Sequence, residues 1–403
     1  MELAPEKAGF SPQRLNRITQ HLGRNYVEPG KITGCQTLVA RHGHVAHFDS
    51  QGYADLERRK PVADDTIFRI YSMTKPITSI ALMQLFEQGH FQLNDRIDRV
   101  IPEWKGMRVY VSGEGEAMET REPEQPMTFR HLLSHTAGLS YGAGRNPVDR
   151  IYKQLDVSRG PGETLSSFVQ KLAGVPLHYT PGTRWMYSFA TDVCGYLVEA
   201  LSGQRLDQYL QEHIFDPLGM VDTAFHVAPE KAHRFAANYE RQLNKKLKLI
   251  DDPETSAYLK EPTFFSGGGG LTGTTADYFR FTEMLRRGGE LDGARIIGKR
   301  TLDLMTRNHL AGGADLTAMA IGAFSETAYE GVGFGLGFAM TLDEVQAGSI
   351  AAGDYYWGGA ASTIFWVDPK EDLVVIFMTQ LMPSATFNFR GQLKNIIYSA
   401  IED

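Results

Sequence analysis

The chain has 403 residues, which is long enough to bury a large core as one domain or as two subdomains. Its net charge of −7 argues against nucleic acid or a membrane surface as a partner, because both attract basic patches. No apolar run is long enough to cross a bilayer, and the first residues lack a secretory leader, so we expect a cytoplasmic protein. Cys35 and Cys194 are expected to be buried free thiols, and no histidine spacing indicates a metal, so we expect neither a metal nor a cofactor.

The first third of the chain begins with an amphipathic helix, predicted over residues 8–28. Two strands, 34–41 and 45–50, follow as a hairpin. The segment from about residue 76 to 310 is mainly helical, apart from an acidic stretch at 113–126 that we expect at the surface. Helical periodicity is found at 128–136, 164–173, 190–203, 206–213, 275–288 and 300–308.

Strand patterns return after residue 330. They cover 335–340, 355–357, 362–367 and 373–378, and a last helix is predicted over 386–401. Strands at both ends of the chain predict an α+β fold, in which N- and C-terminal strands form one antiparallel sheet flanked by helices. We expect a sheet subdomain from residues 1–75 and 311–403, a mainly helical subdomain inserted at 76–310, and the active site at their junction.

The segment Ser72-Met73-Thr74-Lys75 can make a serine nucleophilic without a histidine. Ser72 and Lys75 are three residues apart, so on a helix their side chains share one face. Pro76 limits this helix to a start just before it, which puts Ser72 at the N-terminus, where free N–H groups favour negative charge. A buried lysine beside the serine could lose its proton and act as a base.

Two other motifs are typical of different chemistry, but neither has the surrounding residues that this chemistry requires. Ser140 lies in a Gly-x-Ser-x-Gly pattern, but a helix precedes it where a nucleophile elbow needs a strand, so we interpret it as a loop residue. The glycine run 267–270 lacks the lysine of a phosphate loop and predicts a turn near the active site. His135 and His178 are expected to be structural, because Lys75 already supplies the base.

Five landmarks, spread over the chain in the expected order, resemble one superfamily. They are residues 67–75, 128–139, 181–188, 215–220 and 268–271. These stretches resemble the serine β-lactamases and penicillin-binding proteins, and most closely the class C β-lactamases and the family VIII carboxylesterases. The resemblance implies the β-lactamase/transpeptidase-like fold and an acyl-enzyme formed on Ser72.

The resemblance adds Tyr187 to the catalytic residues, because it matches the tyrosine that relays protons in this superfamily. Tyr187 lies after a turn at 180–182 and before an apolar helix, which places it on a loop at the cleft. A phenol near an ammonium group can be shifted toward phenolate. The third motif of the superfamily corresponds to Trp357-Gly358-Gly359, and the resemblance implies an oxyanion hole formed by the N–H groups of Ser72 and Ala360.

Two departures from the family pattern indicate the substrate. Phe189 stands where β-lactamases carry an asparagine, and Trp357 stands where a lysine would attract the β-lactam carboxylate. Both changes favour a neutral, hydrophobic small-molecule ester. We therefore predict a carboxylesterase for short to medium acyl chains, and we expect substrate contacts from Trp357, Gly358, Gly359, Phe189, Tyr71, Tyr141 and Phe334.

The alternatives with the same catalytic residues are a β-lactamase, a D-amino-acid peptidase and an acyltransferase. A silent penicillin-binding-like module is a further alternative, although an intact Ser72, Lys75 and Tyr187 argue against it. The sequence does not indicate an oligomeric state.

Overall fold

The computed structural model describes residues 1–158, 162–322 and 326–403. Its main element is an eight-stranded sheet in the order β12-β13-β14-β15-β16-β1-β2-β3, in which every neighbouring pair is antiparallel. Strands from both ends of the chain therefore form one sheet, as predicted. The strands are β1 (Gly34–Arg41), β2 (His44–Asp55), β3 (Lys60–Pro61), β12 (Val332–Phe334), β13 (Ala339–Thr341), β14 (Tyr355–Gly358), β15 (Ile364–Asp368) and β16 (Leu373–Thr379).

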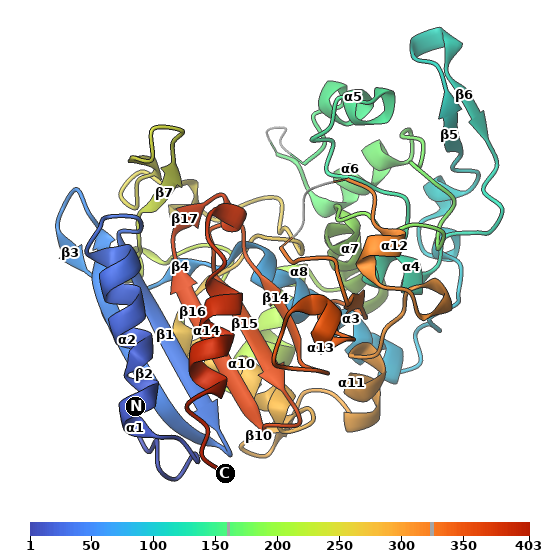
Figure 1. Ribbon diagram of the computed structural model, residues 1–403. Coiled ribbons are helices and arrows are strands. Elements are labelled where there is room, and N and C mark those ends of the chain that lie inside the picture. The colour runs from blue at the N-terminus through green and yellow to red at the C-terminus, as the bar shows by residue number, and fades with distance from the viewer. Residues whose placement is uncertain (159–161, 323–325) are drawn as a thin grey trace.

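The middle strands of this sheet are buried on both faces. Every residue of β1, β15 and β16 is buried, which explains their nearly continuous apolar sequences. The helices α1 (Pro12–Leu15), α2 (Arg17–Leu22) and α14 (Phe389–Tyr398) cover one face, and α10 (Thr275–Arg286) covers the other (Figure 1). The sheet is thus the core of a three-layer structure.

Most other helices lie beyond the β12 edge of the sheet, on the right in Figure 1. Among them, α3 (Thr74–Glu87) packs against α7 (Ala190–Ser202). The remaining helices are α4 (Phe129–Leu133), α5 (Pro147–Gln154), α6 (Leu165–Leu172), α8 (Leu206–Leu210), α9 (Asp216–Leu218), α11 (Lys299–Met305), α12 (Leu316–Met319) and α13 (Glu344–Ala347). In the described part of the chain, no helix has the length and apolar character needed to cross a membrane.

Several short strands form four smaller sheets. The pairs are β4 (Phe68–Arg69) with β9 (Thr272–Gly273), β5 (Val109–Ser112) with β6 (Glu119–Arg121), and β10 (Glu290–Leu291) with β11 (Ala294–Arg295). A three-stranded sheet joins β7 (Asn238–Arg241), β8 (Leu247–Asp251) and β17 (Leu381–Met382). The β4–β9 pair is the one that matters for the site, because β4 leads directly into the Ser72 segment.

The structure confirms the fold class and corrects several predicted elements. The helix predicted over 8–28 is interrupted after Leu15 and ends in a π-helical turn, Gly23–Val27. The strand predicted over 335–340 is confirmed only for its last two residues, because the chain turns at Gly337, with φ +92°, and β13 begins at Ala339. The β7–β8 hairpin and the β5–β6 hairpin in the acidic stretch were not predicted.

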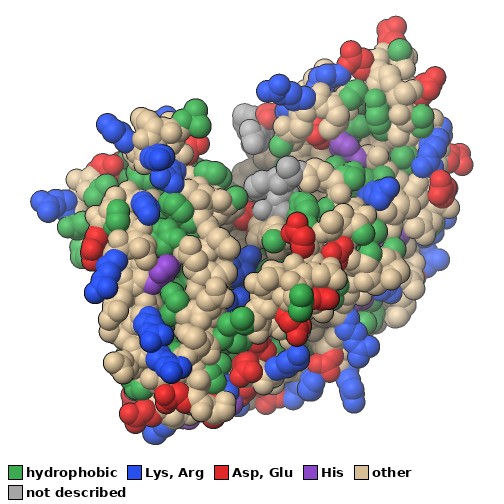
Figure 2. Space-filling view, viewed as in Figure 1, with side chains coloured by type: hydrophobic (Ala, Val, Ile, Leu, Met, Phe, Trp, Pro, Cys, Tyr) green, Lys and Arg blue, Asp and Glu red, His purple; other side chains and the backbone are tan. Residues whose placement is uncertain are grey.

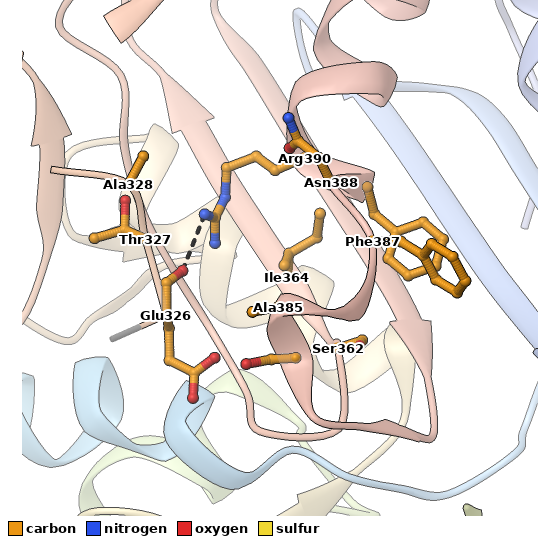
Figure 3. A pocket seen from close by; sticks show the side chains of 11 residues that line it. Glu326, Thr327, Ala328, Ser362, Ile364, Ala385, Phe387, Asn388 and Arg390 are labelled. Atoms are coloured by element: carbon orange, nitrogen blue, oxygen red, sulfur yellow. Dashed lines mark hydrogen bonds between the residues drawn. The ribbon is translucent and has the colours of Figure 1, made fainter. Parts of the chain in front are cut away.

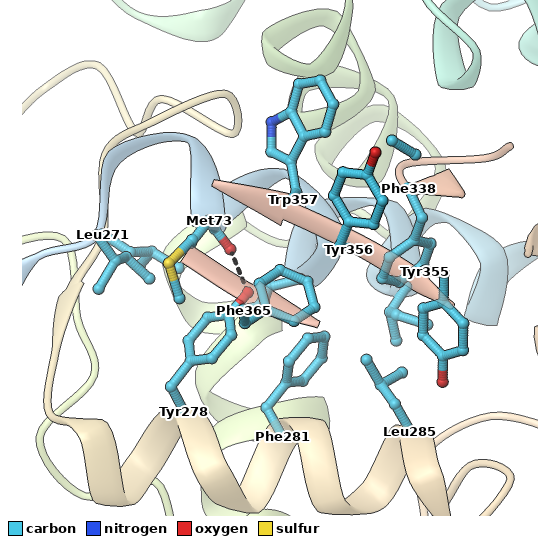
Figure 4. Packing of buried hydrophobic residues seen from close by; sticks show 14 of the residues in the cluster. Met73, Leu271, Tyr278, Phe281, Leu285, Phe338, Tyr355, Tyr356, Trp357 and Phe365 are labelled. Atoms are coloured by element: carbon cyan, nitrogen blue, oxygen red, sulfur yellow. Dashed lines mark hydrogen bonds between the residues drawn. The ribbon is translucent and has the colours of Figure 1, made fainter. Parts of the chain in front are cut away.

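Apolar packing connects the sheet to the Ser72 segment. On α10, Tyr278 and Phe281 face the sheet strands, where Phe365 lies between them and Trp357 (Figure 4). The hydroxyl group of Tyr278 donates a hydrogen bond of 2.9 Å to the carbonyl oxygen of Met73, the residue after Ser72. The backbone at Ser72 is therefore anchored from the buried side.

Candidate active site

Ser72 lies in a tight turn between β4 and α3. Residues Tyr71–Met73 form a 3₁₀ turn, and the α-helix begins at Thr74, so Pro76 falls in its first turn as expected. Tyr71 has φ +41°, a left-handed conformation that costs about 1–2 kcal/mol for a residue with a side chain. Such backbone strain is typical of functional sites, and it presents the Ser72 side chain at the end of the helix.

Lys75 is held against Ser72 in a dry environment. Its Nζ donates to Ser72 Oγ over 3.2 Å and to the carbonyl oxygen of Gly268, and the side chain is only 1% exposed. Burial lowers the pKa of Lys75 to about 8, although the negative charges of Asp192 and Glu326 act in the opposite direction. Near neutral pH an appreciable fraction of this lysine is therefore uncharged and can accept a proton.

The glycine run 267–270 forms a turn that sets the position of Lys75. Asp192 of α7 accepts hydrogen bonds from the N–H of Gly268 over 3.1 Å and from the hydroxyl of Ser266. A Cβ at Gly268 would lie 2.4 Å from the carboxylate of Asp192, so a side chain there would disrupt this arrangement. The sequence predicted this turn, but Asp192 was missed because an acid within an apolar helix shows no partner in sequence.

Tyr187 also lies close to the Lys75 amine. Lys75 Nζ is 4.6 Å from the centre of the Tyr187 ring, and Tyr187 Oη accepts a hydrogen bond of 3.1 Å from the indole N–H of Trp357. Burial raises the pKa of Tyr187 well above its usual value, while hydrogen bonds with Ser72, Trp357 and Tyr141 favour the phenolate. The structure therefore brings Ser72, Lys75 and Tyr187 together.

Two of the residues expected at the substrate lie behind Tyr187 instead. Trp357 is 0% exposed and Phe334 is 1% exposed, and their rings pack edge to face with centroids 5.3 Å apart. Trp357 packs directly against the Tyr187 ring, with centroids 5.2 Å apart, and Phe334 packs against Trp357, so neither lines an open wall. Tyr71 is half-buried, and its hydroxyl accepts a hydrogen bond of 3.0 Å from the side chain of Asn238.

The end of β14 approaches the Ser72 turn closely. A Cβ at Gly359 would lie 2.4 Å from the carbonyl oxygen of Ile70, so only glycine lets the two backbones meet. Gly358 is also packed, with Arg390 and Thr363 near its missing side chain. Within the described residues, the N–H groups of Ser72 and Ala360 have no hydrogen-bond acceptor, so both are available to an oxyanion.

Two cavities are lined by neighbours of the catalytic residues, although neither is lined by Ser72, Lys75 or Tyr187 themselves. One, of about 320 Å³, is lined by Tyr141, Gly142, Ala143, Tyr152, Lys153, Asp156, Val157 and Phe189. The other, of about 230 Å³, is lined by Phe225, Ala257, Tyr258, Lys260, Pro262, Phe264, Ser266, Gly269 and Gly270. Figure 2 shows the surface hollowed between the half that carries α2 and α14 and the half that carries α5.

A third cavity, of about 240 Å³, is lined by the buried acid Glu326 and by the half-buried Arg390. Arg390 donates hydrogen bonds of 3.1 Å to the carbonyl oxygens of Glu326 and Trp357, while the Glu326 carboxylate points away from the guanidinium (Figure 3). Burial raises the pKa of Glu326, and its charge acts on Lys75 and Tyr187. Neither Glu326 nor Arg390 was predicted, because only the tertiary structure brings them to the site.

In the structure, Ser140, His178 and His135 have structural roles and do not form a second catalytic site. Ser140 Oγ donates to Asp149, and His178 Nε2 lies 3.2 Å from that same carboxylate, so the aspartate stands between the serine and the histidine. A catalytic triad needs the histidine in the middle. His135 is buried among hydrogen bonds and aromatic rings, and burial lowers its pKa well below the usual value, so it is neutral.

Both cysteines are buried and unpaired, as predicted. In the ranges that the structure describes, no three His, Cys, Asp or Glu side chains come together as a possible metal site.

Comparison with known proteins places this arrangement in a family. Residues 19–396 match the Beta-lactamase family. Esterase EstB of Burkholderia gladioli is 30% identical over 371 residues, covering 87% of this chain and 86% of the relative. Monacolin J acid methylbutanoyltransferase of Aspergillus terreus is 30% identical over 341 residues, covering 80% of this chain and 79% of the relative.

A solved structure with a similar fold is that of EstCE1, described as a hydrolase with promiscuous acyltransferase activity. It superposes with a TM-score of 0.81 at 28% identity and covers 96% of this chain and 99% of its own. These matches confirm the predicted resemblance to β-lactamase-like serine hydrolases that include esterases. The chain therefore belongs to the beta-lactamase family.

Proposed function

We propose that the protein is a carboxylesterase that cleaves neutral esters through an acyl-enzyme on Ser72. The observation that carries the proposal is the contact between Lys75 and Ser72, in which a buried amine with a pKa of about 8 lies 3.2 Å from the hydroxyl. A base of this strength can deprotonate a serine near neutral pH. The 30% identity to Esterase EstB supports the same chemistry.

In the first step, Lys75 with Tyr187 takes the proton of Ser72 as Oγ attacks the ester carbonyl carbon. The N–H groups of Ser72 and Ala360 stabilise the negative charge on the carbonyl oxygen. The C–O bond to the alcohol then breaks, and Tyr187 returns the proton to the leaving alkoxide. Two hydrogen bonds on Tyr187 Oη, from Trp357 and Tyr141, offset part of the cost of a transient phenolate.

In the second step, water attacks the acyl-enzyme and Lys75 with Tyr187 again moves the proton. An alcohol could attack in place of water, which would make the protein an acyltransferase. This second candidate is favoured by the methylbutanoyltransferase relative and by the described activity of EstCE1. The two candidates differ only in the acceptor.

The direct test is an assay with p-nitrophenyl esters from acetate to decanoate, with nitrocefin alongside and Ser72→Ala as the inactive control. We expect turnover of short and medium esters and little cleavage of nitrocefin, because Trp357 offers no cation to a β-lactam carboxylate. Preferred nitrocefin turnover would contradict the proposal and indicate a β-lactamase. Adding butanol and measuring butyl ester formation separates the transferase from the hydrolase.

The pH dependence tests Lys75 as the base. Only its neutral form accepts a proton, so kcat/KM should rise about tenfold per pH unit below a midpoint near 8 and level off above it. Glu326→Gln removes a negative charge that raises the pKa of Lys75, so this variant should move the midpoint to lower pH. A flat profile from pH 6 to 9 would exclude Lys75 as the rate-determining base.

A further inference from the structure

The guanidinium group of Arg390 joins two segments that are far apart in the sequence. Arg390 lies near the start of α14, and its Nη1 donates a hydrogen bond of 3.1 Å to the carbonyl oxygen of Glu326 (Figure 3). Its Nη2 donates a second bond of 3.1 Å to the carbonyl oxygen of Trp357. A Cβ at Gly358 would lie 3.1 Å from the same Nη2, so the guanidinium packs directly on the backbone of this strand. The role of Arg390 therefore depends on what the two carbonyl groups belong to.

The carbonyl group of Trp357 belongs to the end of β14, which supports two parts of the catalytic site. The indole N–H of Trp357 donates a hydrogen bond of 3.1 Å to Tyr187 Oη, and the two rings pack with centroids 5.2 Å apart. Three residues later, Ala360 carries the N–H that we propose for the oxyanion hole. Between them, Gly359 meets the carbonyl oxygen of Ile70, just before the nucleophile segment. An arginine that holds the Trp357 carbonyl therefore holds the strand that supports both parts.

The carbonyl group of Glu326 belongs to a residue whose charge acts on the catalytic base. The Glu326 side chain is buried, and its carboxylate points away from Arg390 (Figure 3). Its negative charge raises the pKa of Lys75 and that of Tyr187. Burial raises the pKa of Glu326 itself, while a hydrogen bond from Ser384 and the positive charge of Arg390 act in the opposite direction. Arg390 therefore holds the backbone of Glu326 and also favours the charged form of its carboxylate.

Other ionisable side chains also face Lys75. They are Asp192, His135, Tyr141 and Tyr187. Burial raises the pKa of both tyrosines and lowers that of the histidine, so these three are neutral near pH 7. The negative charges at Lys75 thus come from Asp192 and Glu326. Asp192 is held by the glycine turn 267–270, whereas Arg390 holds the Glu326 segment.

We propose that Arg390 is a positioning residue for the esterase site. One of its hydrogen bonds keeps the end of β14 in place for Tyr187 and the oxyanion hole, and the other keeps the charge of Glu326 directed at Lys75. This inference rests on the proposed esterase function. A planar guanidinium can donate to two carbonyl oxygens in fixed directions, which a neutral side chain of similar length cannot do.

The first test is the pH profile of Arg390→Met. Loss of the guanidinium frees the Glu326 backbone and raises the pKa of the carboxylate, so less negative charge acts on Lys75. The pKa of Lys75 then falls, and the midpoint of kcat/KM for p-nitrophenyl butyrate should move to lower pH, as in Glu326→Gln. In the double variant, the midpoint should match that of Glu326→Gln alone, because no carboxylate is left to hold.

The second test concerns the rate above the midpoint. There, Arg390→Met should lower kcat by about 10- to 100-fold, because the end of β14 is no longer held in place. The loss should fall on kcat more than on KM, since oxyanion donors act in the transition state. In Arg390→Ala, added guanidinium should restore part of the activity, because the missing side chain lines the 240 Å³ cavity and leaves room there for this ion. Sodium chloride at the same ionic strength should not.

Gln392→Met is the matched control, because Gln392 lies on the same helix but shares its hydrogen bonds with Tyr26 and His21. It should lower the melting temperature without moving the midpoint. If Arg390→Met does not fold, Arg390→Gln, which is also uncharged, is measured in its place with the same expected direction. The proposal is overturned if the midpoint keeps its wild-type value, if the double variant moves it further than Glu326→Gln, or if Gln392→Met moves it as much. Failure of the esterase proposal is distinct, because the wild-type protein would then turn over no ester at any pH.

Discussion

Replacing Ser72 by alanine is expected to lower kcat/KM for p-nitrophenyl butyrate by about 10⁴- to 10⁶-fold. The change removes the nucleophile itself, the Oγ atom that accepts a hydrogen bond from Lys75 Nζ. The turn at Tyr71 and the hydrogen bond from the Tyr278 hydroxyl to the Met73 carbonyl oxygen remain. The protein should therefore stay folded with its cavities intact. Residual turnover is measured by hydrolysis of the ester. Covalent labelling with a fluorophosphonate is measured separately, and it should label the wild-type protein and leave the variant unlabelled.

Ser140→Ala is the informative control for that experiment. Ser140 lies in the Gly-x-Ser-x-Gly pattern, but its hydroxyl donates to Asp149 and holds the loop that carries Tyr141. Loss of this buried hydrogen bond should cost about 1–3 kcal/mol of stability and appear in thermal melting more than in catalysis. If Ser140→Ala lost its activity and Ser72→Ala kept it, the assignment of the nucleophile would be wrong.

Tyr187→Phe is expected to lower kcat/KM by about 10²- to 10⁴-fold, the usual range for a lost general acid–base. The ring stays in its place between His135 and Trp357, with centroids 5.0 and 5.2 Å away, so the packing is kept. Only the hydroxyl is lost, and with it the proton path to the leaving alcohol. The effect should be larger for alkyl esters than for p-nitrophenyl esters, because p-nitrophenolate leaves without a proton.

This dependence on the leaving group distinguishes a proton donor from a packing residue. Trp357→Phe, which removes the indole N–H and keeps an aromatic ring, is the matched comparison and should weaken both ester types to the same smaller extent. Equal losses for alkyl and p-nitrophenyl esters in Tyr187→Phe would contradict its role as the acid.

The sequence was most informative where chemistry depends on neighbouring residues. The spacing of Ser72 and Lys75 places both on one side of a helical turn, and the two glycines after Trp357 indicate a close backbone approach. Long apolar runs such as 373–378 predicted buried strands, and the antiparallel sheet they form is confirmed.

Contacts between distant segments could not be predicted in the same way. Nothing in the sequence shows that Asp192 and Glu326 act on the same lysine, because each is a single acid in a different part of the chain. The sequence also did not show which aromatic side chains face the cleft. Trp357 and Phe334 were expected to contact substrate, but residue type does not tell which face of β14 or β12 meets the cleft and which is buried. The short β7–β8 hairpin was missed because its strands have only four and five residues, which is too short for a clear strand pattern in the sequence.

The order of strands also determines when the protein can become active during its synthesis. β1 pairs on one edge with β16, so that Leu38 lies opposite Ile376 across almost the full length of the chain. Ser72 leaves the ribosome well before Ala360, which we propose as its oxyanion partner, and before β16, which pairs with β1. Pairing between such distant segments is slow to form and leaves the edge of β1 open in a nascent chain. Under the proposed mechanism, a nascent chain that has not yet reached Ala360 carries Ser72 without the second N–H of its oxyanion hole, so we expect it to be inactive.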